Sequence, residues 1–431
     1  MTTQRLAKGV DVVRPAGQFG SLGMDWPASR VVVESEPSSD DTWLVAKDAQ
    51  HQILEEQQAQ SVYKLAILRR YLAPMMGKLA TLNTPIVLVD GFAGTGASGD
   101  ARGSTALMLE HATPGKYRVP VSVHSVEADA EHFKRLQEVV DVAVAAGCRA
   151  TATFGAIEAN LTSIVRSAAG STLFLFLDPY GANVPYSLLE RTLASDRAAR
   201  WPVTEALLNI SCPLIFREAG IVRGGSLPSK TKVIDEALGG DWWHEYVRRE
   251  LPTDELVATV TVEYATHLAQ AANMDFVLVP IYRHPRHVVP KYYLAYFTRS
   301  PNGIATFIDA VGRGRPDYME ATEEEGDLTL FGDTAAEWAR KEAEREAQAT
   351  IPRLKANILS LSEHHSRFCP MEHALKVYGE DAGIATETQV NSAIKTLLDE
   401  QKLQEVQKPK ISGKRMQGVY VRLAPGISSQ T

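Results

Sequence analysis

Short apolar runs alternate with amphipathic stretches through the middle of this chain. The runs are rich in Val, Ile, Leu, Phe and Ala. They predict strands at 85–89, 121–126, 150–154, 172–177 and 205–210. Between them, apolar residues recur at helix-face spacing, as in Ser104–His111 and Ala130–Ala146. This alternation favours right-handed βαβ units that build one mostly parallel sheet.

Two later apolar runs, Phe276–Ile281 and Tyr292–Phe297, are separated by a Pro-containing turn and predict an antiparallel hairpin. Five parallel strands followed by such a hairpin are the strand inventory of a Rossmann-like methyltransferase sheet. The stretch 211–275, between the fifth strand and the hairpin, predicts a mostly helical insertion with a Gly-rich loop at 220–225. The pattern therefore predicts an α/β fold.

The two ends of the chain depart from this pattern. Residues 1–42 are rich in Gly, Ser, Pro and Asp and predict a loosely ordered arm, so the α/β domain covers 43–332. Residues 333–350 predict a charged connecting helix. Over 351–431, helices and short strands follow in the order of a winged-helix domain. The helices are expected at 351–363, 370–379 and 386–400, and the strands at Arg367–Cys369, Leu403–Gln407 and Gly418–Leu423.

Charge is unevenly distributed along the chain. The 431 residues carry a formal net charge of −7, which argues against nucleic-acid binding by the whole surface, whereas residues 351–431 hold 11 Lys and Arg against 8 Asp and Glu. A mildly basic tail indicates a separate binding module. Lys408, Lys410, Lys414 and Arg415 lie on the expected hairpin turn, where a winged helix contacts phosphates. Solvated surface charge is an equally good interpretation of these four residues.

The three cysteines, Cys148, Cys212 and Cys369, lie far apart, which fits neither a disulfide framework nor a CxxC zinc site. Reduced, mostly buried thiols are expected. Cys212 follows the fifth strand, where a thiol can attack a pyrimidine ring, but a buried structural cysteine is the favoured interpretation. Because no apolar stretch reaches membrane-spanning length and no signal pattern opens the chain, we expect a soluble, cytoplasmic protein without a membrane partner.

The Gly-rich string Asp90-Gly-Phe-Ala-Gly-Thr-Gly96 directly follows the first predicted strand. Glycines there can adopt positive φ and let a ligand approach the backbone. Their G-x-x-G-x-G spacing differs from the G-x-G-x-x-G of dinucleotide sites, and the leading acid repels phosphate but can hold an ammonium. This arrangement is expected for S-adenosylmethionine (SAM), whose amino-acid tail carries a cation. The predicted binding residues are Asp90, Gly91, Phe92, Gly94 and Gly96. The alternative is a tight strand-to-helix turn without a ligand.

Glu127 ends the second predicted strand, where an acid can bridge the two ribose hydroxyls of a nucleoside. A surface or helix-capping acid is the alternative, and Asp129 stands where an N-cap acid would. A contact to adenine is expected after the third strand, within Phe154–Glu158.

Asp178-Pro-Tyr-Gly181 follows the fourth predicted strand, across the expected cleft from the Gly-rich turn. The Asp178 carboxylate and the Pro179 carbonyl can accept both hydrogens of an exocyclic amine, and Tyr180 can stack on a flat substrate ring. We therefore expect these three residues to position a methyl acceptor for in-line displacement. The alternative is a turn in which the aspartate caps the next helix and the tyrosine packs in the core.

The order of these segments resembles the three-Cys-motif partner proteins, which are similar to class I SAM-dependent methyltransferases. The resemblance covers roughly 43–332. It rests on Lys64–Leu72, Asp90–Gly96, Gly103-Ser104, Asp178–Gly181 and Lys291–Gly303. It implies a methyltransferase-like fold and a partnership with a three-cysteine protein that looks like a radical-SAM enzyme. Amino-methylating enzymes usually carry Asp/Asn-Pro-Pro-aromatic, whereas here the aromatic residue comes one position early and is followed by Gly.

These motifs predict a SAM-dependent methyltransferase that acts on nucleic acid or a nucleotide-derived group, with DNA or RNA held by the C-terminal domain and no metal site. Two alternatives stay open. Asp90, Glu127 and Asp178 can surround a metal ion in a nuclease- or hydrolase-like enzyme. Alternatively, the chain keeps the fold as a catalytically silent docking protein.

Overall fold

The computed structural model describes residues 59–98, 101–179, 184–225, 231–284, 287–322, 334–407 and 420–423. The predicted arm at 1–42, Tyr180 and the four basic residues Lys408, Lys410, Lys414 and Arg415 lie outside these described residues. None of the helices within the described ranges is long and apolar enough to cross a membrane.

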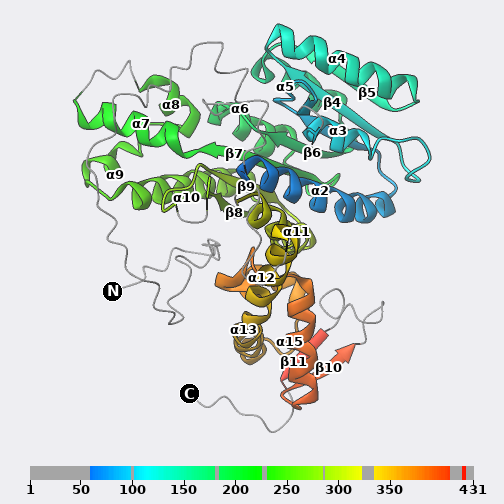
Figure 1. Ribbon diagram of the computed structural model, residues 1–431, viewed down its shortest axis with the longest axis vertical. Coiled ribbons are helices and arrows are strands. Elements are labelled where there is room, and N and C mark those ends of the chain that lie inside the picture. Colours follow the sequence, from blue (N-terminus) through cyan, green and yellow to red (C-terminus); the bar gives the residue numbers. More distant parts are fainter. Residues whose placement is uncertain are drawn as a thin grey trace.

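A seven-stranded sheet forms the centre of the α/β part (Figure 1). Its strands are β1 (Ile86–Asp90), β4 (Val121–Glu127), β5 (Arg149–Phe154), β6 (Thr172–Leu177), β7 (Thr204–Ser211), β8 (Asp275–Ile281) and β9 (Tyr292–Thr298). A separate two-stranded ribbon pairs β2 (Ala97–Ser98) with β3 (Ala101–Arg102). All residues of β1 and β6 are buried, as expected for strands covered on both faces.

The strand order is β5-β4-β1-β6-β7-β9-β8. The first five strands of that order run parallel, and β9 lies antiparallel to both β7 and β8. In chain order this is third, second, first, fourth, fifth, seventh, sixth, which is the order of a Rossmann-like methyltransferase sheet. The predicted α/β fold and its terminal hairpin are therefore confirmed.

Helices cover both faces of the sheet. Alternate strand residues accordingly belong to two different apolar clusters, one on each face. One face packs against α2 (Ala59–Leu79), α3 (Ser104–Leu109), α4 (Ala130–Ala145) and α11 (Pro301–Thr322). The other face packs against α5 (Ile157–Ser167), α6 (Tyr186–Glu190), a π-helical turn at Arg191–Asp196, and α10 (Thr253–Ala272).

Three more helices between β7 and β8 extend the second cluster: α7 (Cys212–Arg223), α8 (Lys232–Leu238) and α9 (His244–Arg248). The Gly-rich loop predicted at 220–225 is wrong for its first part, since α7 continues to Arg223. Ile215 and Ala219 are buried against the core and hold the helix, which outweighs the cost of about 1 kcal/mol for a glycine inside a helix.

Helix α2 is tied to the sheet by a buried polar network. The Tyr71 hydroxyl donates to Glu205 Oε2 at 2.5 Å and lies 2.6 Å from the Tyr296 hydroxyl. Burial raises the pKa of Glu205 above its usual value. On its other side, Arg70 forms a bidentate pair with Asp317 of α11, with both contacts at 2.8 Å. These contacts fix where α2 presents its side chains.

The C-terminal elements pack beneath α11 (Figure 1). Helix α12 (Ala335–Ala349) lies along α11, and Arg315 Nε donates to Glu346 at 2.7 Å. The following elements are α13 (Ile351–His364), a 3₁₀ turn at Pro370–His373, α14 (Ala374–Tyr378), a 3₁₀ turn at Gly379–Asp381, α15 (Glu387–Asp399), β10 (Leu403–Gln407) and β11 (Tyr420–Leu423). Strands β10 and β11 are antiparallel, and Phe368 exchanges two backbone hydrogen bonds with Val421. The helix predicted at 370–379 is therefore split into two short helical turns and α14.

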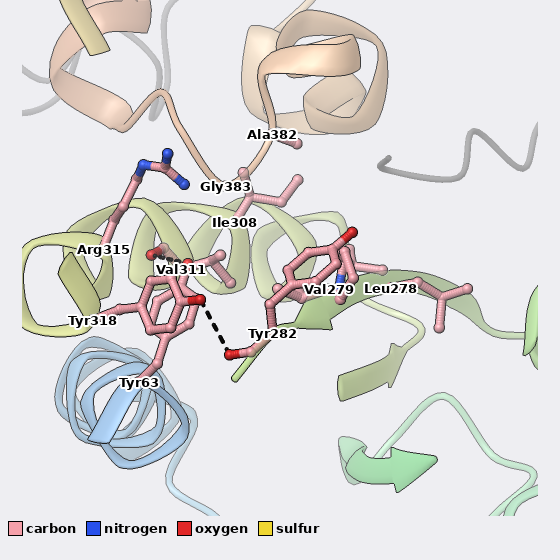
Figure 2. A pocket seen from close by; sticks show the side chains of 12 residues that line it. Tyr63, Leu278, Val279, Tyr282, Ile308, Val311, Arg315, Tyr318, Ala382 and Gly383 are labelled. Atoms are coloured by element: carbon pink, nitrogen blue, oxygen red, sulfur yellow. Dashed lines mark hydrogen bonds between the residues drawn. The ribbon is translucent and has the colours of Figure 1, made fainter. Parts of the chain in front are cut away.

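The α/β part and the C-terminal elements contact each other closely at α11. A Cβ on Gly312 would lie 2.9 Å from the Ala385 carbonyl oxygen, and Asp309 accepts the backbone N–H of Glu387 at the start of α15 at 2.7 Å. A small cavity of about 60 Å³ remains at this junction (Figure 2). Figure 2 shows Tyr63 and Tyr318 stacked below α11 and the Ala382–Gly383 loop above it.

Candidate functional site

The carboxyl ends of the parallel strands gather three predicted site residues at one edge of the sheet. Asp90 ends β1, Glu127 ends β4 and Asp178 directly follows β6. Strand β1 lies between β4 and β6: the chain passes from β1 to β4 on one side, and the later crossover from β5 returns to β6 on the other side. This is a topological switch point, where open α/β sheets bind their ligands.

The glycines in the turn after β1 differ in their surroundings: two are packed against side chains, and one is open. A Cβ on Gly91 would come within 2.4 Å of the Leu177 side chain, and one on Gly96, which has φ +74°, within 2.9 Å of Leu136. A Cβ at either position would therefore force a leucine side chain to move, and at Gly96 the positive φ also favours glycine. Gly94 also has positive φ, +58°, but no atom lies within 4 Å of its Cβ position. The open side of the turn is thus at Gly94, where a ligand can approach the backbone. Phe92 is half-buried and packs against the core under the turn.

Asp90 is fully buried below this turn. Its Oδ2 accepts hydrogen bonds from Ser104 Oγ at 2.6 Å and Thr105 Oγ1 at 2.8 Å, at the start of α3. Its Oδ1 is buried and makes no hydrogen bond within the described residues. Burial raises the pKa of the Asp90 carboxyl to about 6, and the two hydroxyl bonds and the Phe92 backbone N–H only partly oppose this.

Glu127 joins the end of β4 to the glycine turn. Its Oε2 accepts the Gly94 N–H at 2.7 Å, and its Oε1 accepts the Asp129 N–H at 2.7 Å. Each carboxylate oxygen has a second lone pair that remains available to a hydroxyl. Asp129 is the N-cap of α4 and accepts the N–H groups of Glu131 and His132, as predicted.

Asp178 is buried and belongs to a polar cluster that draws on three elements. Lys64 Nζ of α2 forms a close ion pair with Asp178 Oδ2, and Asn209 Nδ2 of β7 donates to Oδ1 at 2.5 Å. The negative charge of Asp178 also contributes to the raised pKa of Asp90. Pro179 is buried beside Asp178, and Tyr180 lies outside the described residues.

Sequence reasoning missed the functional candidates Lys64 and Asn209. Lys64 belongs to a segment that carries the family resemblance, but its own role was not predicted. It lies four residues after Gln60 and four before Leu68, and both of these residues are buried. Asn209 interrupts an otherwise apolar run in β7. A polar residue on a buried helix face and a polar residue within a buried strand are the signals that would have identified them.

The turn between β8 and β9 adds a basic segment at the same edge. Ile281 and Ser211 both pair with Tyr292, so the described residues of this turn, 282–284 and 287–291, lie beyond the carboxyl end of β7. In sequence, the ten residues 282–291 contain Arg283, Arg286, Lys291 and two histidines and no acid. Arg286 lies outside the described residues. Burial and the nearby Arg283 lower the pKa of Lys291 to about 8.

Cys212 lies at the start of α7, below this turn. Its side chain is buried, and burial raises the pKa of the thiol well above its usual value. A thiol of that kind is a poor nucleophile because the thiolate is the reactive form. The expected structural role of Cys212 agrees with this environment.

The carboxylates that a metal site would use are engaged in other contacts. Asp90 is bonded to two hydroxyls, Glu127 to two backbone amides, and Asp178 to a lysine and an asparagine. Within the described ranges, no group of three or more His, Cys, Asp or Glu side chains is arranged to hold a metal ion. The acceptors that remain for a ligand are Asp90 Oδ1 and the second lone pairs of the Glu127 oxygens.

Comparison with known proteins yields no matching family model and no significant match among curated proteins. Solved structures that align with this chain include the small RNA methyltransferase HEN1, with 14% identity over 54% of this chain and 25% of that protein and a TM-score of 0.28. The methyltransferase domain of bacterial CtHen1 aligns with 10% identity over 54% of this chain and 99% of that domain, with a TM-score of 0.28. A putative O-methyltransferase from Klebsiella pneumoniae aligns with 12% identity over 59% of this chain and 96% of that protein, with a TM-score of 0.26. This chain thus spans a quarter of the length of HEN1, and the fold assignment rests on the strand order of the sheet.

Proposed function

We propose that this protein is a SAM-dependent methyltransferase that acts on nucleic acid or on a nucleotide-derived group. The observation that carries the proposal is the buried Asp90 carboxylate beneath the glycine turn, with Oδ1 making no hydrogen bond within the described residues. A buried carboxylate oxygen without a hydrogen bond is costly. The ammonium of an amino-acid tail supplies both the missing donor and a compensating charge.

The other predicted residues have clear roles in this proposal. Gly94 and Gly96 form the open turn over the amino-acid tail, and Gly91 and Phe92 pack beneath it. Glu127 accepts ribose hydroxyls with its remaining lone pairs. When bound, SAM supplies a methyl group on a positively charged sulfur. Asp178 and Pro179 stand on the next strand, where they can position the group that receives the methyl, together with Tyr180.

A polyanionic substrate is supported by charge at the same edge of the sheet. The basic turn directly precedes Tyr292, whose ring centroid lies 5.7 Å from Lys64 Nζ of the Asp178 cluster, on a protein whose net charge is −7. Local positive charge on an acidic protein concentrates phosphates at one place. The C-terminal helices with the β10–β11 hairpin follow the order of a winged helix, and we propose this domain as a second nucleic-acid contact through Lys408, Lys410, Lys414 and Arg415.

The family resemblance adds a proposed partner, a three-cysteine protein similar to radical-SAM enzymes. Co-purification of the two proteins from a strain that expresses both would test the pairing. If the two proteins do not co-purify, that partnership is wrong, and the cofactor proposal is unaffected.

Calorimetry with the demethylated product, S-adenosylhomocysteine (SAH), tests the cofactor site directly. We expect SAH binding in the wild type and a loss of at least roughly tenfold in Asp90→Asn, because the charge that holds the ammonium is removed. Asp275→Asn is the control: it removes one carboxylate charge at an exposed position that begins β8 at the opposite edge of the sheet.

The same experiment separates the alternatives. Binding of magnesium without binding of SAH would contradict the proposal and favour the hydrolase-like reading. Binding of SAH with no methyl transfer to DNA, RNA or nucleotides, even with the three-cysteine partner present, would favour the silent docking protein.

A further inference from the structure

We infer that the group methylated at this site is a hydroxyl, and that Lys64 and Asp178 act on it as a pair. The inference rests on the proposed function and names its substrate class. It replaces the exocyclic amine that the Asp-Pro-Tyr string predicts with an oxygen nucleophile.

The pair is held at the ligand-binding edge by contacts from several elements. The Lys64 and Asp178 side chains are only 12% and 11% exposed. Lys64 Nζ also lies 5.7 Å from the centroid of the Tyr292 ring, so the ammonium is placed between a carboxylate and an aromatic face. One helical turn earlier, the Gln60 carbonyl accepts the Tyr292 hydroxyl at 2.8 Å, which fixes the start of α2 over β9.

The ammonium distinguishes between the two kinds of acceptor. An amine nitrogen attacks through its neutral lone pair and becomes positive as the new bond forms, so a neighbouring lysine cation opposes the reaction.

A hydroxyl has the opposite needs. It becomes a good nucleophile as it loses its proton, and the negative charge that develops on oxygen is stabilised by the lysine cation. Asp178 is the base that receives the proton. Asn209 holds Asp178 in place from β7, so we assign it as a positioning residue.

The step balances with these groups. The hydroxyl oxygen forms a bond to the methyl carbon, the carbon–sulfur bond breaks with its electron pair remaining on sulfur, and the hydroxyl proton moves to Asp178. The products are a methyl ether, SAH and a protonated Asp178, which afterwards gives its proton to water. Lys64 keeps its charge throughout.

The location argues against a purely structural ion pair. Buried ion pairs contribute little net stability, because desolvation offsets their attraction. This pair stands beside the switch point of the sheet, next to the buried Asp90, and Asp178 already has a neutral partner in Asn209. A role in binding and reaction accounts for that position.

The experiment uses the full chain with methyl-labelled SAM and three acceptor pools: RNA, DNA, and a mixture of nucleosides and phenols. Digestion and mass spectrometry then locate the label. We expect the label on oxygen. Label in RNA but not DNA identifies a ribose hydroxyl, whereas label in the small-molecule pool identifies a free hydroxyl compound.

Variants test the pair itself. Lys64→Met keeps the length of the side chain and removes its charge, and we expect kcat to fall roughly 100-fold or more. SAH affinity, measured by calorimetry, should change by less than about threefold. Lys78→Met is the control, because Lys78 lies near the other end of α2 and contacts Thr306 rather than the site.

Three results would overturn the inference: label on nitrogen or carbon, no label in any pool although SAH binds, or Lys64→Met with wild-type turnover. Label on nitrogen would leave the proposed methyltransferase function standing. Failure of the wild type to bind SAH would overturn the proposed function as well, so the two failures are distinguishable.

Discussion

Burial of the Asp90 carboxyl destabilises its charged form and also leaves Oδ1 available to a cationic ligand. Full burial disfavours its charged form and raises its pKa to about 6. In the ligand-free protein, the ionised carboxylate has two hydroxyl donors on one oxygen and none among the described residues on the other. A cation at Oδ1 removes this imbalance, so we expect ligand binding and ionisation of Asp90 to be coupled.

SAH affinity should therefore depend on pH. Because the ammonium prefers the ionised carboxylate, we expect affinity to rise about tenfold between pH 5 and pH 7, as Asp90 ionises around pH 6. Calorimetry at intervals across this range measures the change. Asp90→Asn should bind weakly with no such rise, and the same rise in that variant would assign the pH dependence to another group.

The stability of the ligand-free protein should show the opposite sign. A carboxyl whose folded pKa is raised contributes most stability at low pH and loses it as pH rises from about 4 to about 6. Relative to wild type, Asp90→Asn should thus gain roughly 1–2 kcal/mol between pH 5 and pH 7.5 in denaturant titrations. This comparison is the control that separates burial of the charge from binding of the ligand.

Among the elements, α2 and α11 connect the site to the rest of the fold. Helix α2 presents Lys64 at the sheet edge and is anchored by Tyr71 to Glu205 and by Arg70 to Asp317. Helix α11 contacts α2 on one side and the C-terminal elements on the other. The close approach at Gly312 shows how tightly that second contact is made.

Two glycine substitutions should change stability in opposite directions. Gly312→Ala places a methyl group 2.9 Å from the Ala385 carbonyl oxygen, and we expect a loss of about 1–3 kcal/mol in the free energy of unfolding. Gly77→Ala, in an exposed part of α2 with nothing within 4 Å, should gain roughly 0.5–1 kcal/mol. Denaturant titration measures both. An unchanged midpoint for Gly312→Ala would mean that the two parts separate easily.

For the whole molecule, the distribution of charge is more informative than its sum. The net charge of −7 disfavours nonspecific contact with polyanions, whereas the turn at 282–291 places basic residues without an acid at the site edge. The apolar cluster beneath α2 and α11 also continues into the C-terminal elements, from Leu354 to Val421. One shared apolar core thus connects the proposed catalytic α/β part to the C-terminal domain that we propose as a nucleic-acid contact.

Salt dependence tests the basic turn. We expect Arg283→Ala to weaken binding of a short single-stranded RNA and to reduce the slope of log K against log salt by roughly 0.7, the value for one lost phosphate contact. Fluorescence anisotropy at several salt concentrations measures the slope. Arg166→Ala, in the last turn of α5 on the opposite edge, is the control. Equal slopes for wild type and Arg283→Ala would remove the turn from the interface.

Local sequence patterns were sufficient for much of the fold. The strands of the central sheet, the order of helices and the capping of α4 by Asp129 follow from periodicity and local backbone chemistry, which neighbouring residues determine, whereas the strand predicted at Arg367–Cys369 is only a single bridge from Phe368 to Val421. Local patterns did not predict that α7 continues through Gly220. Tertiary packing of Ile215 and Ala219 outweighs the weak helix preference of glycine there.

The sequence by itself determined where the strands of the central sheet lie along the chain, through the alternation of apolar runs, and the positions of Asp90, Glu127 and Asp178 at strand ends. Only the tertiary structure decided what those acids contact, because their partners come from distant segments. Lys64 lies 114 positions from Asp178, and Asn209 lies 31 positions away. Folding of α2 and β7 onto one edge of the sheet brings a cation and an amide to the carboxylate, and this changes the inferred acceptor from an amine to a hydroxyl.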